Sequence, residues 1–187
     1  SKGCVRGKEA VWPFHSWVWD AEGRCVDIPY ANNIPPKAKI RGWDTLERNG
    51  LIYVWHDHER NSPLTEQLPK KIDDWYSGNW TDWTMQTFRI DSNCRELIDN
   101  MADFAHFGPV HYSKVNVFKN IQDGHTFTQY LEGGHEILTT AGTPLTSVAT
   151  YEGPAYMTTV MTGEMNGEPT KVHLLISHTP VDFESFD

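Results

Sequence analysis

The chain has 187 residues, and its 16 Lys and Arg stand against 25 Asp and Glu, which gives a formal charge of −9. A surface of that sign repels a phosphate backbone, and no basic stripe interrupts it, so nucleic acid is not expected as a partner. No stretch approaches the roughly 20 apolar residues that a membrane-spanning helix needs. The three cysteines (Cys4, Cys25, Cys94) are odd in number and far apart, which argues against a disulfide framework and favours a reducing, cytoplasmic setting.

The first sixty residues have the pattern of short strands separated by turns. Residues 17–19 and 24–28 are two strand candidates on either side of a glycine-containing turn. Two further candidates, residues 37–43 and 51–55, flank Asn49-Gly50, which is a strong hairpin signal. Residues 1–60 are therefore predicted to form a small all-β unit.

Residues 61–82 are rich in charged residues, proline and serine and show no sustained period, which is typical of a connector between domains. Alternation returns over residues 83–90, which predicts a strand at the start of a second domain over residues 83–187. From about residue 126 to residue 176, and again over residues 172–181, the pattern is that of strands. Glycine-containing turns are expected between them, at Gly133-Gly134, Gly142, Gly153-Pro154, Gly163 and Gly167.

A helix is predicted after residue 93. Asn93 is a suitable N-cap, and Glu96 three residues later completes the capping-box pattern. The Gly108-Pro109 pair is expected to end or kink this helix. With one helix among many strands, the predicted fold class is α+β with an antiparallel sheet. The apolar stripe that would pack on that sheet repeats every four residues: Leu97, Met101 and Ala105.

One polar pattern around this helix carries chemistry. Residues three apart on a helix are neighbours on one surface, so Asn100, Asp103 and His106 share a stripe. His111 lies five residues after His106, and the Gly-Pro break between them would let both imidazoles converge on one ion. Two histidines beside a carboxylate suit a borderline metal such as ferrous iron, or zinc in a metal-dependent hydrolase. The plainer alternative is that the two histidines are unrelated and do not share an ion. The remaining histidines, such as His135 and His173, are expected only to pack in the core or on the surface.

The spacing Asn-x-x-Asp-x-x-His-x-x-x-x-His over residues 100–111 resembles the mononuclear iron motif of Rieske non-haem iron oxygenases. By that resemblance, His106 and His111 are ligands of Fe²⁺. Asp103 would be the acid that passes electrons from a neighbouring subunit's iron–sulfur cluster, and Asn100 would lie close to the iron. The third ligand in this family is a carboxylate on a late helix, expected beyond residue 187. The implied fold is the C-terminal part of a Rieske β domain followed by part of a helix-grip catalytic domain.

A second motif lies near the start of the chain. Val11-Trp12-Pro13-Phe14-His15 resembles the second half of a Rieske cluster motif, which normally reads Cys-Pro-Phe-His. A [2Fe–2S] cluster of this type needs two Cys and two His, and His15 would be one of the four ligands. Trp12 occupies the cysteine position, and an indole cannot ligate iron. The other half, Cys-x-His, is not found in the sequence, so the implied cluster site is incomplete.

Further segments, residues 28–31, 54–59, 93–103 and 118–120, resemble oxygenase components of 3-ketosteroid 9α-hydroxylases. The resemblance implies a monooxygenase that hydroxylates a steroid or similar apolar polycyclic substrate with O₂. It also implies a ferredoxin-type reductase as partner and a homotrimeric assembly. Aromatic-acid oxygenases and sterol desaturases of the same family remain alternatives, as does a catalytically dead helix-grip binder of apolar ligands. The chain is expected to be a fragment that does not turn over alone.

Overall fold

The structure is a computed structural model that describes residues 2–137, 139, 143–153, 156–165 and 167–187. Its contacts group into two compact units, Ser1–Leu64 and Thr65–Asp187. Among the described residues, no helix is both long enough and apolar enough to cross a membrane.

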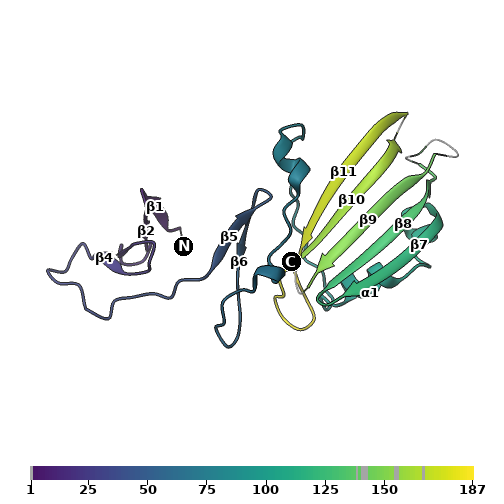
Figure 1. Ribbon diagram of the computed structural model, residues 1–187. Coiled ribbons are helices and arrows are strands. Elements are labelled where there is room, and N and C mark those ends of the chain that lie inside the picture. The colour runs from purple at the N-terminus through teal and green to yellow at the C-terminus, as the bar shows by residue number, and fades with distance from the viewer. Residues whose placement is uncertain (1, 138, 140–142, 154–155, 166) are drawn as a thin grey trace. The chain divides into compact units, whose positions relative to one another are not determined.

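The first unit contains a four-stranded antiparallel sheet (Figure 1). Val18 and Ile28 are its most deeply buried apolar side chains, so this small sheet has only a thin core. The predicted all-β character is confirmed, with strands at or beside both of the first two predicted positions. In spatial order the strands are β1 (Cys4–Arg6), β2 (Glu9–Val11), β3 (Val18–Trp19) and β4 (Cys25–Asp27).

A separate hairpin comes next, formed by β5 (Thr45–Arg48) and β6 (Leu51–Val54). Asn49 and Gly50 both have positive φ, at 55° and 75°, as a two-residue type I′ turn requires. The turn was predicted correctly, but the prediction of a strand over residues 37–43 is wrong. A two-residue turn pairs the residues directly beside it, so the first arm must end at Arg48. In residues 37–43 the only strand pairing is an isolated bridge between Arg24 and Lys39.

The second unit is built on a five-stranded antiparallel sheet in which neighbours along the chain are neighbours in space (Figure 1). Two short 3₁₀ helices, η1 (Thr65–Gln67) and η2 (Asp73–Ser77), precede the sheet. The predicted antiparallel run is confirmed and begins earlier than expected. Its strands are β7 (Ser113–Asp123), β8 (Thr126–His135), β9 (Leu145–Glu152), β10 (Tyr156–Met165) and β11 (Glu168–Ser177).

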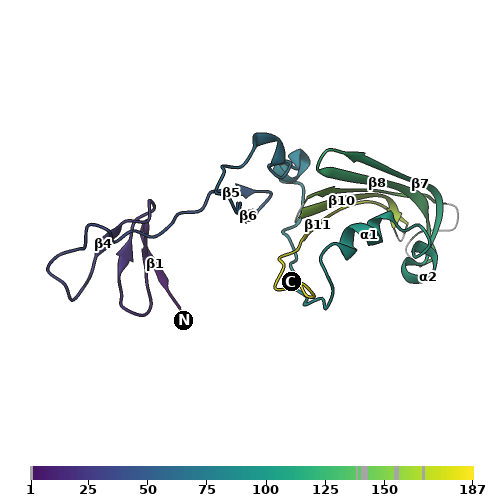
Figure 2. The same cartoon turned by 90° about the horizontal axis from the view of Figure 1, so that it is seen from below.

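Helix α1 (Glu96–Ala102) lies in the hollow of this curved sheet, as Figure 2 shows. Met101 is the buried residue through which the helix joins the core. The predicted apolar stripe therefore faces the sheet through Leu97 and Met101, whereas Ala105 lies beyond the end of α1 and is exposed. Burial of the first two side chains holds so short a helix in place. The core consists of Met101, Ala149, Tyr151 and Met157, with Leu97, Ile98 and Phe127 packed against it.

Helix α1 begins later and ends earlier than the sequence pattern predicts. Asn93 does not cap it: its side-chain oxygen accepts the N–H of Arg95 at 3.0 Å, which forms a turn before the helix. At the other end Asp103 leaves the helical conformation, with φ −80° and ψ 118°. The prediction that Gly108-Pro109 ends this helix is therefore wrong.

Gly108-Pro109 lies instead inside a second short helix, α2 (Phe107–His111). Pro109 is its third residue, within the first turn, where a backbone N–H would have no acceptor inside the helix. The missing donor therefore costs nothing at this position, which explains how a helix accommodates the pair.

Residues 83–90 were predicted to be a strand, and only Ile90 takes part in strand pairing, through a bridge to Phe186. Alternation alone does not make a strand, because the backbone also needs a neighbour to bond. In the described chain no strand runs beside residues 83–89.

The glycines that were expected at turns are only partly confirmed there. Gly167 lies at a turn, but Gly133-Gly134 and Gly163 lie within strands. Gly142 and Pro154 lie outside the described residues.

Candidate metal centre

The candidate centre lies where the chain passes from α1 to α2. Asp103 comes directly after the last residue of α1, and its Oδ1 accepts the N–H of Ala105 at 2.8 Å. An aspartate that bonds the backbone two residues on stabilises a tight turn. This turn redirects the chain, so that His106 caps the start of α2 and His111 is the last residue of that helix.

The imidazole rings of His106 and His111 are adjacent. Their centroids are 5.1 Å apart and their planes are inclined by 72°. The predicted convergence of the two rings is therefore present, but it does not need a break in the helix. Both histidines belong to the single turn of α2, with Gly108-Pro109 inside it.

The side chain of His106 is largely buried, and its ring nitrogens lack hydrogen-bond partners. Its side chain is 12% exposed, and Nδ1 lies 3.3 Å from Oδ2 of Asp103. That approach has the distance of an ion pair without the alignment of a hydrogen bond, so Nδ1 and Nε2 are both buried without a hydrogen-bond partner. Burying unpaired polar atoms is costly, and a metal ion is one kind of partner that one of these ring nitrogens could bind.

Burial lowers the pKa of His111, and the nearby charges of His106 and then His135 lower it further. His111 is therefore held in the neutral form, which is the form that binds metals. The influence of His135 on His111 places it close to the pair. The sequence pattern gave it no role, because its proximity arises from strand pairing, with His135 opposite Ser113 across β7 and β8.

Aromatic side chains surround the two histidines. The ring of Phe107 lies 4.4 Å from that of His106, and 5.8 Å from that of Phe118 on β7. Phe104 also contacts Phe118, at 5.5 Å. These rings form an apolar wall beside the two imidazoles, although Phe104 itself is 55% exposed. Sequence reasoning missed the wall because its members come from three different elements.

The end of α1 is tied to the sheet beneath it. Gln129 on β8 donates a side-chain hydrogen bond to the carbonyl oxygen of Met101. Because this bond lies two residues before Asp103, it fixes the height of the turn above the sheet. The Asn100 carbonyl, also near the end of α1, accepts the N–H of Asp103 at 3.3 Å, while the Asn100 side chain is exposed.

The described residues contain no group of three or more His, Cys, Asp or Glu close enough to hold a metal ion. His106 and His111 thus fit two coordination positions, and Asp103 lies against a ligand ring rather than beside it as a third donor. A neighbouring carboxylate of this kind fixes the orientation of a ligating ring. The expected third ligand stays a prediction.

The loop between β2 and β3 carries the second motif. It is closed by hydrogen bonds from the Trp12 N–H to the Trp17 carbonyl (2.8 Å) and from the Ser16 N–H to the Trp12 carbonyl (2.9 Å). The His15 ring lies 4.2 Å from Phe14, and the Trp12 side chain is 57% exposed. An indole nitrogen is a hydrogen-bond donor only, so this loop offers a [2Fe–2S] cluster one imidazole and no thiolate. The residues present do not fit that cluster.

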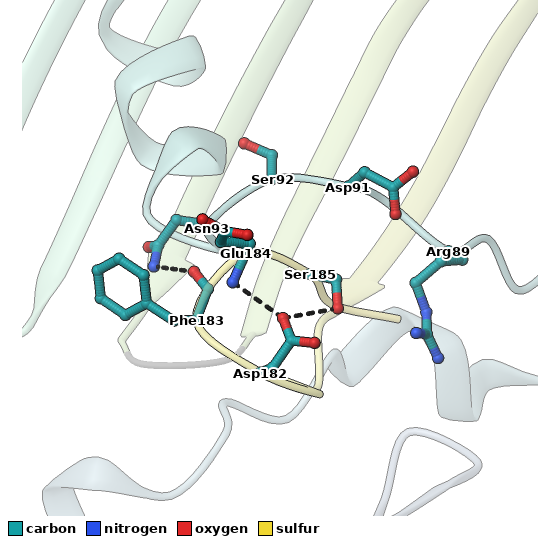
Figure 3. A pocket seen from close by; sticks show the side chains of 8 residues that line it. All are labelled: Arg89, Asp91, Ser92, Asn93, Asp182, Phe183, Glu184 and Ser185. Atoms are coloured by element: carbon teal, nitrogen blue, oxygen red, sulfur yellow. Dashed lines mark hydrogen bonds between the residues drawn. The ribbon is translucent and has the colours of Figure 1, made fainter.

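A surface pocket lies elsewhere, at the two segments that the bridge between Ile90 and Phe186 joins (Figure 3). Its volume is about 680 Å³. Asp182 organises the loop, accepting the N–H of Glu184 and the hydroxyl of Ser185, each at 2.9 Å. None of the residues predicted to carry chemistry lines it: the lining consists of Arg89, Asp91, Ser92, Asn93, Asp182, Phe183, Glu184 and Ser185.

Comparison with known proteins finds relatives over the whole chain. Residues 54–187 match the family model described as the 3-ketosteroid 9alpha-hydroxylase C-terminal domain. The whole chain aligns with the oxygenase component of 3-ketosteroid-9-alpha-monooxygenase from Rhodococcus rhodochrous, at 42% identity over half of that protein's length. The corresponding proteins of Mycolicibacterium smegmatis and Mycobacterium tuberculosis are 41% and 39% identical, again over half of their length.

Solved structures of the same fold include dicamba monooxygenase bound to dicamba, with a TM-score of 0.72 and 20% identity. The match covers 98% of this chain and 59% of that one. A quaternary ammonium Rieske monooxygenase matches all of this chain and 53% of its own, with a TM-score of 0.66 and 17% identity. The chain thus spans about half the length of the curated relatives that it matches. On the family model and these relatives, the chain belongs to the family of 3-ketosteroid 9α-hydroxylase oxygenase components.

Proposed function

We propose that this chain is a portion of a monooxygenase that hydroxylates a steroid or a similar apolar polycyclic substrate, using O₂ and electrons from a reductase. The observation that carries the proposal is the pair of imidazoles of His106 and His111, 5.1 Å apart, with the Asp103 carboxylate beside the first ring. Relatives at 39–42% identity are named for 3-ketosteroid oxygenation, which supports the substrate class.

His106 and His111 are proposed to hold the mononuclear Fe²⁺. Ferrous iron bound to two histidines and a carboxylate, with open positions, supplies the chemistry of oxygen activation. The chain's own part is to keep both rings in place, and partial burial, which lowers the pKa of His111, keeps that ring unprotonated. A carboxylate outside these 187 residues is proposed as the third ligand.

Asp103 is assigned to orienting His106. A carboxylate that accepts the N–H of one ring nitrogen leaves the other nitrogen free for the metal and fixes the tautomer. Oδ2 of Asp103 lies 3.3 Å from Nδ1 of His106, which is the nitrogen assigned to it. Asn100 contributes from the end of α1 through its carbonyl, which anchors the backbone of Asp103.

The apolar substrate is proposed to lie on the α1 side of the sheet. Directly opposed residues in neighbouring antiparallel strands point to one face, so Met157 on β10 and Ile176 on β11 share a face, as do Thr159 and Leu174. Met157 contacts the α1 core, which identifies this face as the inner one. Leu174 and Ile176 leave apolar surface there for a substrate to cover.

The proposed assembly is a cytoplasmic homotrimer served by a ferredoxin-type reductase. The relatives are named oxygenase components, which implies that a separate component supplies their electrons. The acidic charge of −9 suits a soluble redox partner with a basic docking face.

The test is anaerobic Fe²⁺ titration of the protein, followed by addition of a 3-ketosteroid. One iron per chain is expected, with a steroid-dependent change in the iron's near-infrared circular dichroism. The His106→Ala variant should lose both signals, and His125→Ala, at a histidine outside the site, should keep them. Steroid binding without iron uptake would instead identify an apolar-ligand carrier, and activity supported by zinc without O₂ would identify a hydrolase. If an aromatic acid produced this change and the steroid did not, the substrate class would be aromatic acids.

A further inference from the structure

The loop of residues 12–17, here called the tip loop, lacks a ligand that its motif requires, whereas the iron motif keeps both of its histidines. The Trp12 backbone is fixed twice, through its N–H to Trp17 and through its carbonyl to Ser16. Residue 12 therefore sits at the base of the loop, where the family motif places a cysteine. The side chain that extends from this fixed point is an indole.

No other thiol of this unit replaces the missing one. Cys25 is buried, and its thiol is directed toward the Asp27 carbonyl at 3.5 Å. Cys4 is exposed and pairs directly with Val11 across β1 and β2. Directly paired residues share a face, so Cys4 lies on the face of Val11, in β1 and outside the tip loop.

The tip loop is instead packed as an aromatic element. The Trp17 indole N–H donates to the Tyr30 hydroxyl at 2.6 Å. The His15 ring lies between Phe14 and Tyr30, at 4.2 Å and 6.4 Å. These contacts leave His15 next to aromatic rings, where a cluster ligand would need a second histidine and two thiolates around the same ions.

We propose that Trp12 makes this unit unable to hold a [2Fe–2S] cluster, so that the tip loop is a cluster-free aromatic element. A Cys-x-His half supplied from elsewhere in the protein would still leave the cluster one thiolate short. Under the function proposed above, the iron at His106 and His111 then draws its electrons from a donor other than this unit. The statement about the cluster stands independently of that function.

The experiment uses the protein with all residues that its gene encodes before Ser1 and after Asp187. Wild type, Trp12→Cys and the matched control Trp12→Phe are reconstituted anaerobically with iron and sulfide. Acid-labile sulfide per chain is measured, together with the low-temperature electron paramagnetic resonance spectrum after reduction. Wild type and Trp12→Phe should remain at background, whereas Trp12→Cys should gain about two sulfides per chain and a Rieske-type signal.

Two sulfides per chain and that signal in the wild type would overturn the proposal. A Trp12→Cys protein that stays as cluster-free as the wild type would overturn the assignment of the loss to Trp12. Mononuclear iron is counted in the same samples as a check on folding and on the other site. If the proposed function fails, that iron is absent from all three proteins, whereas the sulfide result is unaffected.

Discussion

His106 and His173 are both buried histidines beside an aspartate, yet their surroundings differ. The side chain of His173 is 6% exposed, and Nε2 lies 3.1 Å from Asp74. Asp74 also binds Lys171, and the Trp80 ring packs on His173 at 4.6 Å. These partners join the segment around η2 to β11, which is a structural role. A buried histidine with an acid is therefore not sufficient to indicate a metal centre.

What separates the two positions is the second imidazole and the unpaired nitrogens. His106 has His111 beside it and no hydrogen-bond partner on either nitrogen, whereas His173 lacks a partner only on Nδ1. The His173 ring lies against the Asp74 carboxylate and the Trp80 indole. The comparison teaches that a candidate ligand site is marked by unsatisfied ring nitrogens next to a second imidazole, and four measurements test it.

The largest expected effect is on metal affinity. His106→Ala should lower Fe²⁺ affinity by at least about 100-fold, since loss of a ligand should exceed loss of an outer partner. His173→Ala should leave that affinity unchanged, because its ring belongs to the contact with η2. An anaerobic titration against a chromophoric chelator measures both. Equal losses in the two variants would remove the distinction between the two histidines.

The two aspartates should differ in the same way. Asp103→Asn should weaken Fe²⁺ binding by roughly 10–100-fold, because a carboxylate that orients a ligand ring is replaced by an amide. Asp74→Asn is the matched control and should bind iron like the wild type. The chelator titration measures both variants. If Asp103→Asn binds as tightly as Asp74→Asn, Asp103 does not orient the ring.

Asp74→Asn should instead lower stability, by about 0.5–1 kcal/mol after allowance for the partial exposure of the pair with Lys171. The hydrogen bond from Lys171, together with contacts to His173, lowers the pKa of Asp74 below its ordinary value. A lowered carboxylate pKa means that this stability is present above the unfolded-state pKa and is lost as the pH falls through the folded one. Urea unfolding at pH 7 and in acid should show this loss in the wild type and a smaller one in Asp74→Asn.

A third buried histidine sharpens the comparison through its charge state. His178 lies 3.0 Å from the Tyr151 hydroxyl, and burial lowers its pKa. The unfolded chain then binds a proton more readily than the folded one, so the free energy of unfolding should fall as the pH drops below about 6.5. His178→Gln, which retains a polar side chain, should reduce that dependence in urea unfolding at pH 8 and pH 5.5. An unchanged slope would show that His178 is not the group responsible.

Tyr151 responds in the opposite sense at high pH. Burial raises its pKa to about 12, so its hydroxyl stays protonated and hydrogen-bonded to Nε2 of the neutral His178 at ordinary pH. This pair lies in the core beside Met101 rather than at the two candidate ligands. The Tyr151 hydroxyl therefore has a hydrogen-bond partner, which again contrasts with the two ring nitrogens of His106.

The sequence was most informative where a pattern is local. The turn at Asn49-Gly50 and the placement of Met101 in the core are explained by residue type and spacing, and both are confirmed. The spacing of His106 and His111 likewise predicted adjacent rings correctly. Such features depend on a few neighbouring residues, so the rest of the fold does not alter them.

Sequence reasoning failed where tertiary contacts decide. Residues 83–89 alternate like a strand, but pairing depends on a neighbour that the alternation does not specify. The contacts of Phe118 with Phe104, and the influence of His135 on His111, arise from strand register across the sheet. Gly133 was taken for a turn, whereas it lies in β8 at the point where β7 approaches too closely for a side chain. Close approach and a turn both favour glycine, so residue type could not separate them.

The single turn of α2 sets the separation of the two imidazoles. Both rings are placed by one continuous run of backbone, from the cap at His106 to the last helical residue, His111. Each residue added to a helix rotates all later residues by about 100° around its axis, so one insertion beside Pro109 would turn the second ring away while leaving the sheet untouched. The proline also limits how far the backbone could adjust. The separation of the rings therefore depends on the number of residues between them. This short stretch should tolerate substitutions far better than insertions or deletions.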